Sequence, residues 1–362
     1  MIEKFHLIVL GTDPSSRSGG IANALYGYFN ALQQSELCFD FVATHHAYSS
    51  GGKYRHWLVS FFEIFKLLRK GRRAGKYVVA YIHVGGGIPS FVRKSILAFF
   101  IRILGAPVVM QLHGLEVATY MASLYWRLFF RIATGPANVL CVLTPWWKNL
   151  LDNSGIKKTI HIVPNPLDEE WEAIAQQPIS RSSNKNEITV LSVARVEPGK
   201  GVDLLVEAIP YLPDFVKVVV AGDGALLQGI NNRVVALGVE RQVSFLGWVG
   251  LEEKLRLMRE ADIFCLPSSY DSFGMGFVEA MAHALPVVAL DWGPIHDVVP
   301  DGKCGILIKK PDPKLLADAI ARLAGDYELR AGFGKNGQAW VLEQFGSEVV
   351  GAKIRTVMEA IC

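Results

Sequence analysis

Short apolar runs alternate with amphipathic stretches along the chain, and this alternation restricts the possible folds more than any other feature of the sequence. In the first half the apolar runs are HLIVL, YVVAYIHV, APVVMQLHG and NVLCVLT, and the helical patterns between them begin near Gly20, His56, Pro89 and Ala118. The same order returns in EITVLSVAR, VKVVVAGDG, QVSFLGWV, ADIFCLP and LPVVAL. Continuous apolar strands joined by helices are typical of parallel sheets that helices cover on both faces. The pattern therefore predicts an α/β fold.

The length of the chain and one polar segment indicate two domains. A chain of 362 residues is too long for one ordinary core. Residues 176–187, QQPISRSSNKNE, are polar and rich in Ser and Asn, as expected of an exposed linker. We therefore place one domain at residues 1–175 and another at residues 188–344, with a cleft between them. Residues 345–362 have the apolar spacing of a helix, which can pack on either domain.

The composition favours a protein of a reducing compartment. The five cysteines are scattered, show neither metal-ligand nor disulfide spacing, and lie mostly in apolar runs, so we expect reduced and buried thiols. We recognise no secretory signal and no apolar stretch long enough to span a membrane. We therefore expect a cytoplasmic protein.

The charge is divided unevenly along the chain. Residues 1–150 contain 16 Lys and Arg against 6 Asp and Glu, a net charge of +10, whereas the remainder carries −7. This asymmetry predicts an anionic partner for the first half, either phosphates or a membrane surface. No nucleic-acid-binding motif accompanies the positive charge, so nucleic acid is not an expected partner.

The segment RHWLVSFFEIFKLLRKGRR, residues 55–73, mixes aromatic and basic residues. It carries Trp57, Phe61, Phe65 and Leu68 on one helical stripe and a dense set of cations near its end, and FVRKSILAFFIRIL and YWRLFFRI add similar mixtures. Basic amphipathic helices of this kind can lie on the surface of an anionic membrane. Equally, such a helix can pack on a core and expose its basic face to solvent.

In the second half, candidate ligand-binding residues follow the predicted strands, because in such sheets ligands bind at the carboxyl ends of strands. Arg195 and Lys200 lie between EITVLSVA and the helical pattern VDLLVEAI, where two cations beside a helix start suit a diphosphate. The alternative is an exposed basic turn.

The stretch PSSYDSFGMGFVEAMA follows another strand and contains two carboxylates, Asp271 and Glu279, with Gly274 and Gly276 between them. The glycines allow the backbone to approach a ligand closely at a helix start. If the helix starts near Phe273, the carboxylates lie roughly 10 Å apart, from the helical rise of about 1.5 Å per residue. Retaining glycosidases hold such a pair about 5–5.5 Å apart and inverting ones about 6.5–9.5 Å, so a hydrolase is disfavoured. Two separated acceptors suit the hydroxyl groups of one elongated ligand, although Glu279 could instead be a helix surface residue.

The first half offers fewer candidates. Gly19 and Gly20 lead into a helix after the first strand, either as a simple turn or as a ligand loop, but the G-x-G-x-x-G fingerprint of a dinucleotide site is missing. His113 ends a buried strand and faces the expected cleft, where it can bond a sugar hydroxyl or buffer developing charge, unless it is merely structural. His45, His46 and His83 show no patterned partners.

The chain resembles the retaining glycosyltransferases of family four in SVARVEPGKGVDLLVEA, VVVAGDGALL, FLGWV and PSSYDSFGMGFVEAMAHALPVVA, taken in that order. GGIANAL, LHG and IVPNPLD, residues 162–168, extend the resemblance over nearly the whole chain. The resemblance implies the GT-B fold, in which two Rossmann-like domains face each other across a cleft. It also implies that the last helix crosses back to the first domain.

The resemblance further implies roles for the candidate residues. Arg195 and Lys200 would bind the donor diphosphate, and Glu279 would hold the ribose. The donor sugar or phosphate would contact His113, Asp271 and the backbone amides of Phe273, Gly274, Met275 and Gly276, while Gly19 and Gly20 would close on the diphosphate. Asp271 departs from the family, which has Glu at this place, because its side chain is one methylene shorter.

The activity implied is metal-independent transfer of a hexosyl group, with retention, from a nucleoside diphosphate sugar to a saccharide or a lipid-linked acceptor. No cofactor besides the donor is expected, and a role in bacterial polysaccharide or glycolipid synthesis is expected at the cytoplasmic side of the membrane. Arg195, Lys200 and a helix N-terminus would stabilise the charge that builds on the leaving diphosphate. The alternatives are a non-catalytic nucleotide-sugar binding protein, suggested by Asp271, and an oxidoreductase, disfavoured by the missing glycine fingerprint.

Overall fold

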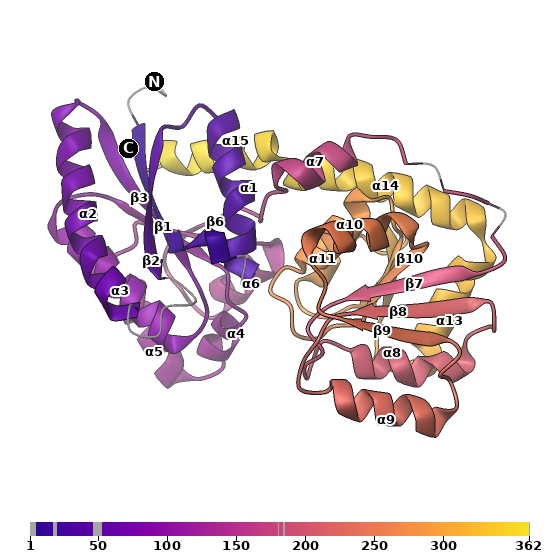
Figure 1. Cartoon of the computed structure of the whole chain (residues 1–362). Helices are drawn as coiled ribbons and strands as arrows, with labels where there is room; N and C mark the ends of the chain where they lie inside the picture. Colours follow the sequence, from indigo (N-terminus) through magenta and orange to yellow (C-terminus); the bar gives the residue numbers. More distant parts are fainter. Residues whose placement is uncertain (1–4, 17–19, 46–52, 180, 184, 362) are drawn as a thin grey trace. The chain divides into compact units, whose positions relative to one another are not determined.

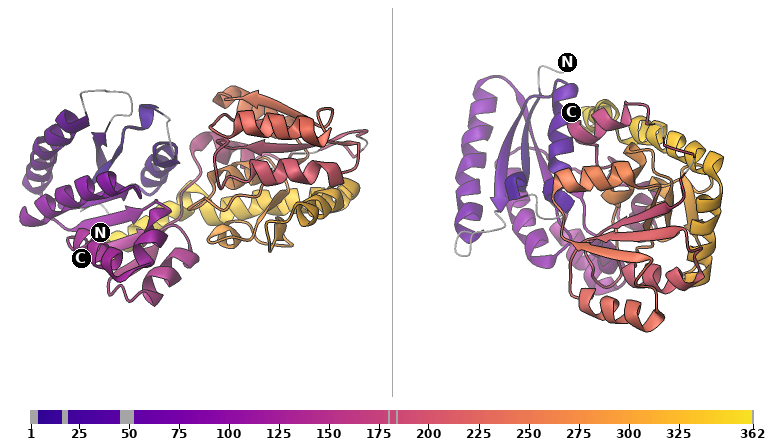
Figure 2. Two further views of the ribbon diagram at one scale, coloured as in Figure 1. Left: turned by 90° about the horizontal axis from the view of Figure 1, so that it is seen from below. Right: turned by 45° about the vertical axis from the view of Figure 1, so that its right-hand side comes forward.

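The computed structural model describes residues 5–16, 20–45, 53–179, 181–183 and 185–361. They form two compact units, one made of Met1–Glu169 with Gln344–Cys362 and the other of Glu170–Glu343 (Figure 1). Within the described residues, each unit has a six-stranded sheet whose strand pairs are parallel. Helices cover both faces of each sheet (Figure 2), so the predicted α/β fold of Rossmann type is confirmed.

The first unit is built around the strand order β2-β1-β3-β4-β5-β6. Its strands are β1 (Phe5–Thr12), β2 (Phe39–His45), β3 (Tyr77–Val84), β4 (Val108–Leu112), β5 (Val139–Val142) and β6 (Thr159–Ile162). Its helices are α1 (Gly20–Gln34), α2 (Lys53–Arg73), α3 (Ile88–Ile103), α4 (Glu116–Met121), α5 (Leu124–Ala133), α6 (Pro145–Asn153) and α15 (Ser347–Glu359), with a short turn of 3-10 helix at Pro14–Ser16.

The second unit has the strand order β12-β11-β10-β7-β8-β9. Its strands are β7 (Ile188–Val193), β8 (Val216–Ala221), β9 (Val243–Gly247), β10 (Ile263–Leu266), β11 (Val287–Leu290) and β12 (Gly305–Ile308). Its helices are α7 (Glu169–Ala175), α8 (Val202–Ala208), α9 (Leu227–Leu237), α10 (Leu251–Glu260), α11 (Met275–Ala282), α12 (Ile295–Val298), α13 (Pro313–Gly325) and α14 (Tyr327–Phe345), with a 3-10 turn at Ile209–Tyr211.

Three strands escaped the sequence analysis, and all three lie at sheet edges. They are β2 and β6 in the first unit and β12 in the second. An edge strand pairs on one side only and is covered less completely, so its sequence need not be a long apolar run. Accordingly β2 contains Asp40, β6 contains the half-buried His161, and β12 is only four residues long.

The boundary between the units lies earlier than the expected one, at Glu170 instead of after residue 175. The reason is Trp171 on α7, which is buried and contacts His283 of the second unit edge to face, with ring centroids 5.2 Å apart. The expected linker is also anchored at one point. The guanidinium of Arg181 donates hydrogen bonds to the backbone carbonyls of Met258, Arg259 and His283, so this part of residues 176–187 is fixed to the second unit.

The C-terminal helix α15 packs on α1 in the first unit, where Figure 1 shows the yellow and indigo helices side by side. Val350, Ile354 and Val357 of α15 belong to the same buried cluster as Leu25 and Leu32 of α1. The two backbones approach closely at Gly351, since a Cβ atom there would overlap Ser35 Oγ and the carbonyl of Ala31. Close packing between these helices therefore requires glycine at position 351.

We expect Gly351→Ala to lower the free energy of unfolding by about 1–3 kcal/mol, because the added methyl group meets backbone as well as side chain. Gly332→Ala on α14 is the matched control. A Cβ atom at position 332 has open space around it, so the better helix propensity of Ala should raise stability by up to about 1 kcal/mol. Urea unfolding of both variants measures the difference, and equal effects would contradict the close contact.

Candidate functional site

The candidate donor site of the second unit lies where the strand order reverses. The chain passes from β7 outward to β8 and β9 and then returns to place β10 on the other side of β7. At such a reversal the loops after the two neighbouring strands leave in opposite directions and create a place for a ligand. The loop after β7 carries Arg195 and Lys200, and the loop after β10 carries Asp271.

These two loops are in direct contact. Ser269 donates its backbone N–H to the carbonyl of Gly199 at 2.8 Å, and Ser268 Oγ donates to the same carbonyl at 3.1 Å. Gly201, in the left-handed region at φ 77°, lies so close to the carbonyl of Pro267 that a side chain would overlap it. The glycines of PGKG therefore serve the meeting of the two loops.

Lys200 and Asp271 form an ion pair across this contact. Lys200 Nζ lies 2.8 Å from Asp271 Oδ1 and donates a further hydrogen bond of 2.9 Å to the carbonyl of Tyr270. Both side chains are largely shielded from solvent. Asp271 Oδ2 is buried and accepts no hydrogen bond from the part of the chain that the structure describes. The ammonium group has a third N–H, so both partners retain the capacity to bind a ligand.

Arg195 is placed differently from Lys200. Its side chain is 67% exposed, and its guanidinium forms an ion pair of 2.9 Å with Glu197, two residues along the same loop. A surface pair of this kind contributes little to stability and is easily exchanged. The structure therefore brings Lys200 and Asp271 together but leaves Arg195 on the outside of the loop.

Helix α11 begins at Met275, two residues after the expected start at Phe273. Gly274 ends the loop in the left-handed conformation, at φ 81°, and a Cβ atom there would overlap the Phe277 ring. Phe273 is buried and anchors the turn. Gly276 differs, because the nearest atom to its Cβ position is Phe264 Cζ at an ordinary 3.5 Å. The protein's own packing thus requires glycine at position 274 but not at position 276.

Glu279 is not the helix surface residue that the sequence left open. It is buried on α11 and forms an ion pair with Lys254 of α10, whose ammonium also lies 5.1 Å from the centroid of the Trp171 ring. Lys254 was not singled out in the sequence, because LEEKLRLMRE has the appearance of an ordinary charged surface helix. Only the packing of α10 beside α11 makes it a partner of Glu279.

Asp271 lies in the loop before α11, so the helical rise does not give its distance from Glu279. The separation expected from the sequence, and the objection to a hydrolase that rested on it, therefore do not apply. What separates the two carboxylates functionally is that each is held by its own lysine, Lys200 and Lys254 respectively.

In the first unit the strand order reverses between β1 and β3. Gly20 begins α1 after β1, whereas Gly19 lies outside the described residues. His113 directly follows β4 and is buried, and its Nε2 lies 2.9 Å from Nδ1 of His83 at the end of β3. His83, for which the sequence showed no patterned partner, is therefore the partner of His113. Adjacent parallel strands brought together two histidines that are 30 residues apart.

Lys94 lies next to this histidine pair. It is buried on α3 and donates a hydrogen bond to the backbone carbonyl of His83. Burial, with the nearby charge of Arg93, lowers the pKa of Lys94 to about 7. Burial also lowers the pKa of His113 to about 3, and the charge of Lys94 adds to this effect. His113 is thus neutral at physiological pH, which favours a hydrogen-bonding role and disfavours the buffering of charge.

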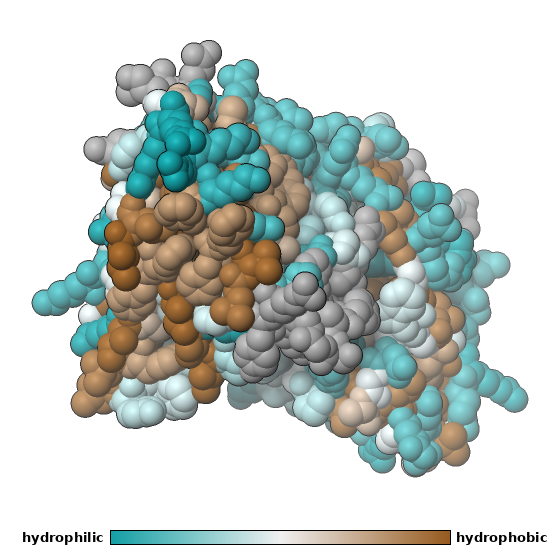
Figure 3. All heavy atoms as spheres, turned by 60° about the vertical axis from the view of Figure 1, so that its left-hand side comes forward, coloured by the Kyte–Doolittle hydropathy of each residue, from teal (hydrophilic) through white to brown (hydrophobic). Residues whose placement is uncertain are grey.

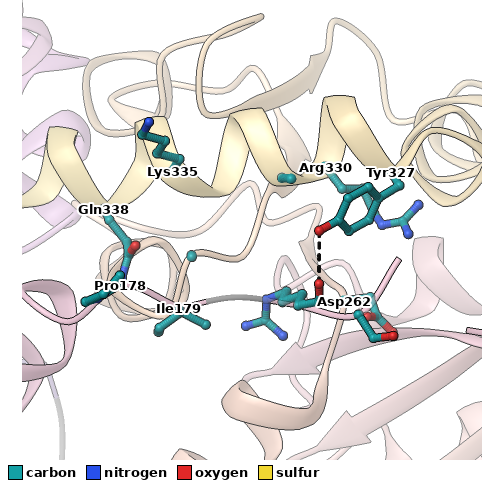
Figure 4. Close-up of a pocket in the computed structure, with 11 residues that line it drawn as sticks. Pro178, Ile179, Asp262, Tyr327, Arg330, Lys335 and Gln338 are labelled. Atoms are coloured by element: carbon teal, nitrogen blue, oxygen red, sulfur yellow. Dashed lines mark hydrogen bonds between the residues drawn. The ribbon is translucent and has the colours of Figure 1, made fainter. Parts of the chain in front are cut away.

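The second unit also has a pocket of about 510 Å³, which is not lined by Lys200, Asp271 or Glu279 (Figure 4). It is lined by the linker, by α14 and by Asp262, which precedes β10 and so marks the opposite edge of the sheet. The Tyr327 hydroxyl donates to the carbonyl of Arg181 at 3.0 Å, and burial lowers the pKa of Arg181 to about 10. The pocket therefore belongs to the anchoring of the linker.

No cluster of three or more His, Cys, Asp or Glu residues in the described ranges of the chain has the arrangement of a metal site. Likewise, none of the helices that the structure describes has the length and apolar character needed to cross a membrane.

Comparison with known proteins places the chain among sugar-transferring enzymes. A family model described as glycosyl transferases group 1 matches residues 174–340. An uncharacterized glycosyltransferase of Methanocaldococcus jannaschii is 30% identical over 259 residues, which cover 71% of this chain and 70% of that protein. A GDP-mannose-dependent alpha-(1-6)-phosphatidylinositol monomannoside mannosyltransferase of Mycobacterium tuberculosis is 27% identical over 304 residues, covering 79% and 77%.

Solved structures share the fold over the whole chain. A sucrose-phosphate synthase of Thermosynechococcus elongatus has a TM-score of 0.75 at 19% identity and covers 98% of each chain. HepE of Anabaena, solved with UDP and glucose, has a TM-score of 0.72 at 19% identity and covers 98% of this chain and 99% of that one. At such identities the likeness shows the fold alone, and that fold is GT-B.

The lowered pKa of Lys94 predicts a change of stability with pH. The folded protein releases the Lys94 proton near pH 7, whereas the unfolded chain keeps it up to about pH 10.5. Between these values the unfolded chain binds the extra proton, so a rise in pH stabilises the folded state. From pH 7 to pH 9.5 the wild type should gain about 3 kcal/mol of unfolding free energy relative to Lys94→Met.

The matched control for this prediction is Lys66→Met on the exposed surface of α2. Its unfolding free energy relative to the wild type should stay constant between the two pH values. Urea unfolding at both pH values measures the two differences. If the difference in unfolding free energy between wild type and Lys94→Met grows with pH no more than the difference for Lys66→Met, the pKa of Lys94 is not lowered.

Proposed function

The chain belongs to the group 1 glycosyl transferases and has the GT-B fold, and from this premise we propose that it transfers a hexosyl group, with retention, from a nucleoside diphosphate sugar. The observation that carries the proposal is the Lys200–Asp271 ion pair at the strand reversal of the second unit, next to the start of α11. A cation and a helix start suit a diphosphate, and the carboxylate beside them suits a sugar hydroxyl.

Lys200 binds the diphosphate in this proposal. Its third N–H is free for a phosphate oxygen, and the first backbone N–H groups of α11 have no partner within the helix. Arg195 exchanges Glu197 for phosphate, since its ion pair is exposed. The two cations and the start of α11 stabilise the charge that develops on the leaving group, the role that a metal ion has in other transferases.

The reaction breaks the bond between the anomeric carbon and the phosphate oxygen. The acceptor hydroxyl forms the new bond on the same face of the sugar, and its proton passes to the leaving phosphate, so the configuration is retained. Asp271 accepts from a hydroxyl of the donor sugar through Oδ2, which is buried and unoccupied by any described residue. His113, neutral because burial lowers its pKa, bonds another donor hydroxyl.

Glu279 holds the ribose in this proposal. Its carboxylate is already oriented by Lys254, and the second oxygen of a carboxylate can accept from ribose hydroxyls while the first stays paired. The donor also accounts for the absence of a side chain at Gly276. Its own surroundings leave room for a side chain, so approach of the donor is the reason that remains for glycine at this position.

The acceptor in this proposal is a saccharide carried on a lipid, and the enzyme works from the cytoplasm as a peripheral protein of the inner membrane face. The names of two mycobacterial relatives support a lipid acceptor, because both describe transfer to phosphatidylinositol compounds. The net charge of +10 in the first 150 residues supports an anionic partner for that unit. Bacterial glycolipid or polysaccharide synthesis is the corresponding role.

The donor class is tested by a thermal-shift panel of UDP, GDP, ADP, NAD and NADP with the purified protein. We expect one nucleoside diphosphate to raise the melting temperature, because it binds only the folded state, and NAD and NADP to leave it unchanged. Lys200→Met should lose the shift, whereas Lys335→Met on α14, at the opposite edge of the sheet, should keep it. A shift with NAD or NADP alone would favour an oxidoreductase, and binding without sugar transfer to any acceptor would favour a binding protein.

Glu279→Ala should weaken binding of that nucleoside diphosphate by roughly 1.5–3 kcal/mol, the contribution of a hydrogen bond to a charged group. Isothermal titration measures the affinity. Glu253→Ala on α10 is the control, since Glu253 is half-buried and pairs with Arg256 on the same helix. Equal affinities for the two variants would contradict the ribose assignment.

A further inference from the structure

Three helices of the first unit each expose a row of large apolar side chains. On α3 the row is Ile88, Val92, Ile96, Phe99 and Ile103, at the three-to-four-residue spacing of one helix face. On α2 it is Leu58, Phe62 and Phe65, and on α5 it is Leu124, Leu128 and Ile132. The opposite sides of these helices carry buried residues, such as Ile64 on α2, Leu97 on α3 and Phe130 on α5. The three rows are therefore additional to the faces that pack on the sheet.

The three rows form one continuous surface, because α3 packs against both α2 and α5. Trp57 Nε1 donates to the carbonyl of Arg93 at 3.2 Å, and the rings of Phe61 and Phe100 lie 5.0 Å apart. On the other side the ring of Phe91 lies 6.0 Å from that of Phe129. We call this surface the α2–α3–α5 face. Figure 3 shows the broad area of apolar side chains on this side of the molecule, with hydrophilic residues above it.

The apolar stripe predicted from the sequence of α2 was a different one, made of Trp57, Phe61, Phe65 and Leu68. Trp57 and Phe61 instead contact α3, and Leu68 is buried. Only Phe65 belongs to both rows. The outward row, which includes Leu58 and Phe62, lies one residue further round the helix, so its position depends on how α2 meets α3.

Cations surround this face and are not neutralised. They are Lys66, Arg69, Lys70, Arg72 and Arg73 on α2, Arg93 and Arg102 on α3, and Arg127 and Arg131 on α5. Among the described residues none of them forms an ion pair with a carboxylate. The three helices contain one acidic residue in all, Glu63. The face thus combines exposed apolar side chains with an uncompensated positive rim.

We propose that the α2–α3–α5 face docks on a membrane rich in anionic lipid. Phe62, Phe99 and Leu128, from the three helices, enter the boundary between headgroups and acyl chains, and the surrounding Arg and Lys bind lipid phosphates. The inference rests on the proposed function in one respect, the lipid-linked acceptor, and adds to it the surface that meets the membrane.

Charge decides between the candidate occupants of this face. A second copy of the same face would bring positive against positive, which opposes a symmetric dimer. Lysine is depleted at protein interfaces, yet Lys66 and Lys70 belong to the positive rim of this face. A bilayer offers an apolar interior and a dense anionic surface at once, and so matches both parts of the face.

The face also adjoins the candidate site of the first unit. α3 begins at Ile88, directly after the turn Gly85–Gly87 that follows β3 and His83. The Tyr120 hydroxyl donates to the carbonyl of Gly86 and ties this turn to α4, which follows His113. A lipid headgroup bound at the start of α3 therefore lies at the same edge of the sheet as the histidine pair.

Sedimentation with phospholipid vesicles tests the proposal without need of any sugar donor. The wild type should bind vesicles containing phosphatidylglycerol, should bind pure phosphatidylcholine at least about tenfold more weakly, and should be released by salt. Phe62→Glu with Leu128→Glu should weaken binding to the anionic vesicles by about tenfold or more, because two large apolar side chains can no longer enter the bilayer.

The matched control is Val235→Glu with Leu315→Glu. These residues are also exposed on helices, 65% and 43% against 71% and 56% for Phe62 and Leu128, and the change in charge is the same. This variant should bind vesicles like the wild type. Both double variants should keep the thermal shift with the nucleoside diphosphate, so failure of the docking proposal is distinguishable from failure of the proposed function.

Two outcomes would overturn the docking proposal. One is a wild type that stays in the supernatant with anionic vesicles, and the other is a Phe62→Glu, Leu128→Glu variant that sediments like the wild type. Light scattering adds an independent measurement. A wild-type dimer that becomes a monomer in this variant would assign the face to a second copy of the chain instead.

Discussion

The ion pair between Lys200 and Asp271 depends on the order of strands in the second sheet, and the candidate donor site depends on that ion pair. β10 lies beside β7, so the loops that follow them meet although the contacting residues Gly199 and Ser268 are 69 residues apart in the chain. The loops can touch because Gly201 has no side chain where the carbonyl of Pro267 lies. The start of α11, and with it the direction of Glu279, follows from the path of the second loop.

The polar groups of both candidate sites are oriented before any ligand is present. Asp271 and Glu279, the two candidate carboxylates of the second unit, are each held by a lysine, and His113 is held by His83. Groups fixed in this way need little rearrangement during a reaction, which is the physical basis of electrostatic stabilisation by enzymes. The cost is that Lys94 and the histidines are buried without compensating charge, and the lowered pKa values of all three report it.

The helices α2, α3 and α5 differ from ordinary surface helices in having two apolar sides. One side is buried in the first unit, and the other exposes a second row of apolar side chains. A helix that is apolar nearly all round is normally buried in a core or in lipid. Here the rows are interrupted by arginine and lysine, whose long apolar stems and charged ends suit the interface between water and a bilayer.

The sequence by itself determined the α/β class, the central strands and the residues at their carboxyl ends, because continuous apolar runs and glycine-rich loops are local patterns. Arg195, Lys200, Asp271, Glu279 and His113 were found in this way. The tertiary structure decided what these residues contact. His83, Lys94 and Lys254 became partners only through the packing of strands and helices distant in the chain. The edge strands β2, β6 and β12 were not recognised, because polar residues interrupt or closely flank their short apolar runs. The outward row on α2 was likewise decided by its contact with α3, since helical spacing shows that an apolar face exists but not which neighbour covers it.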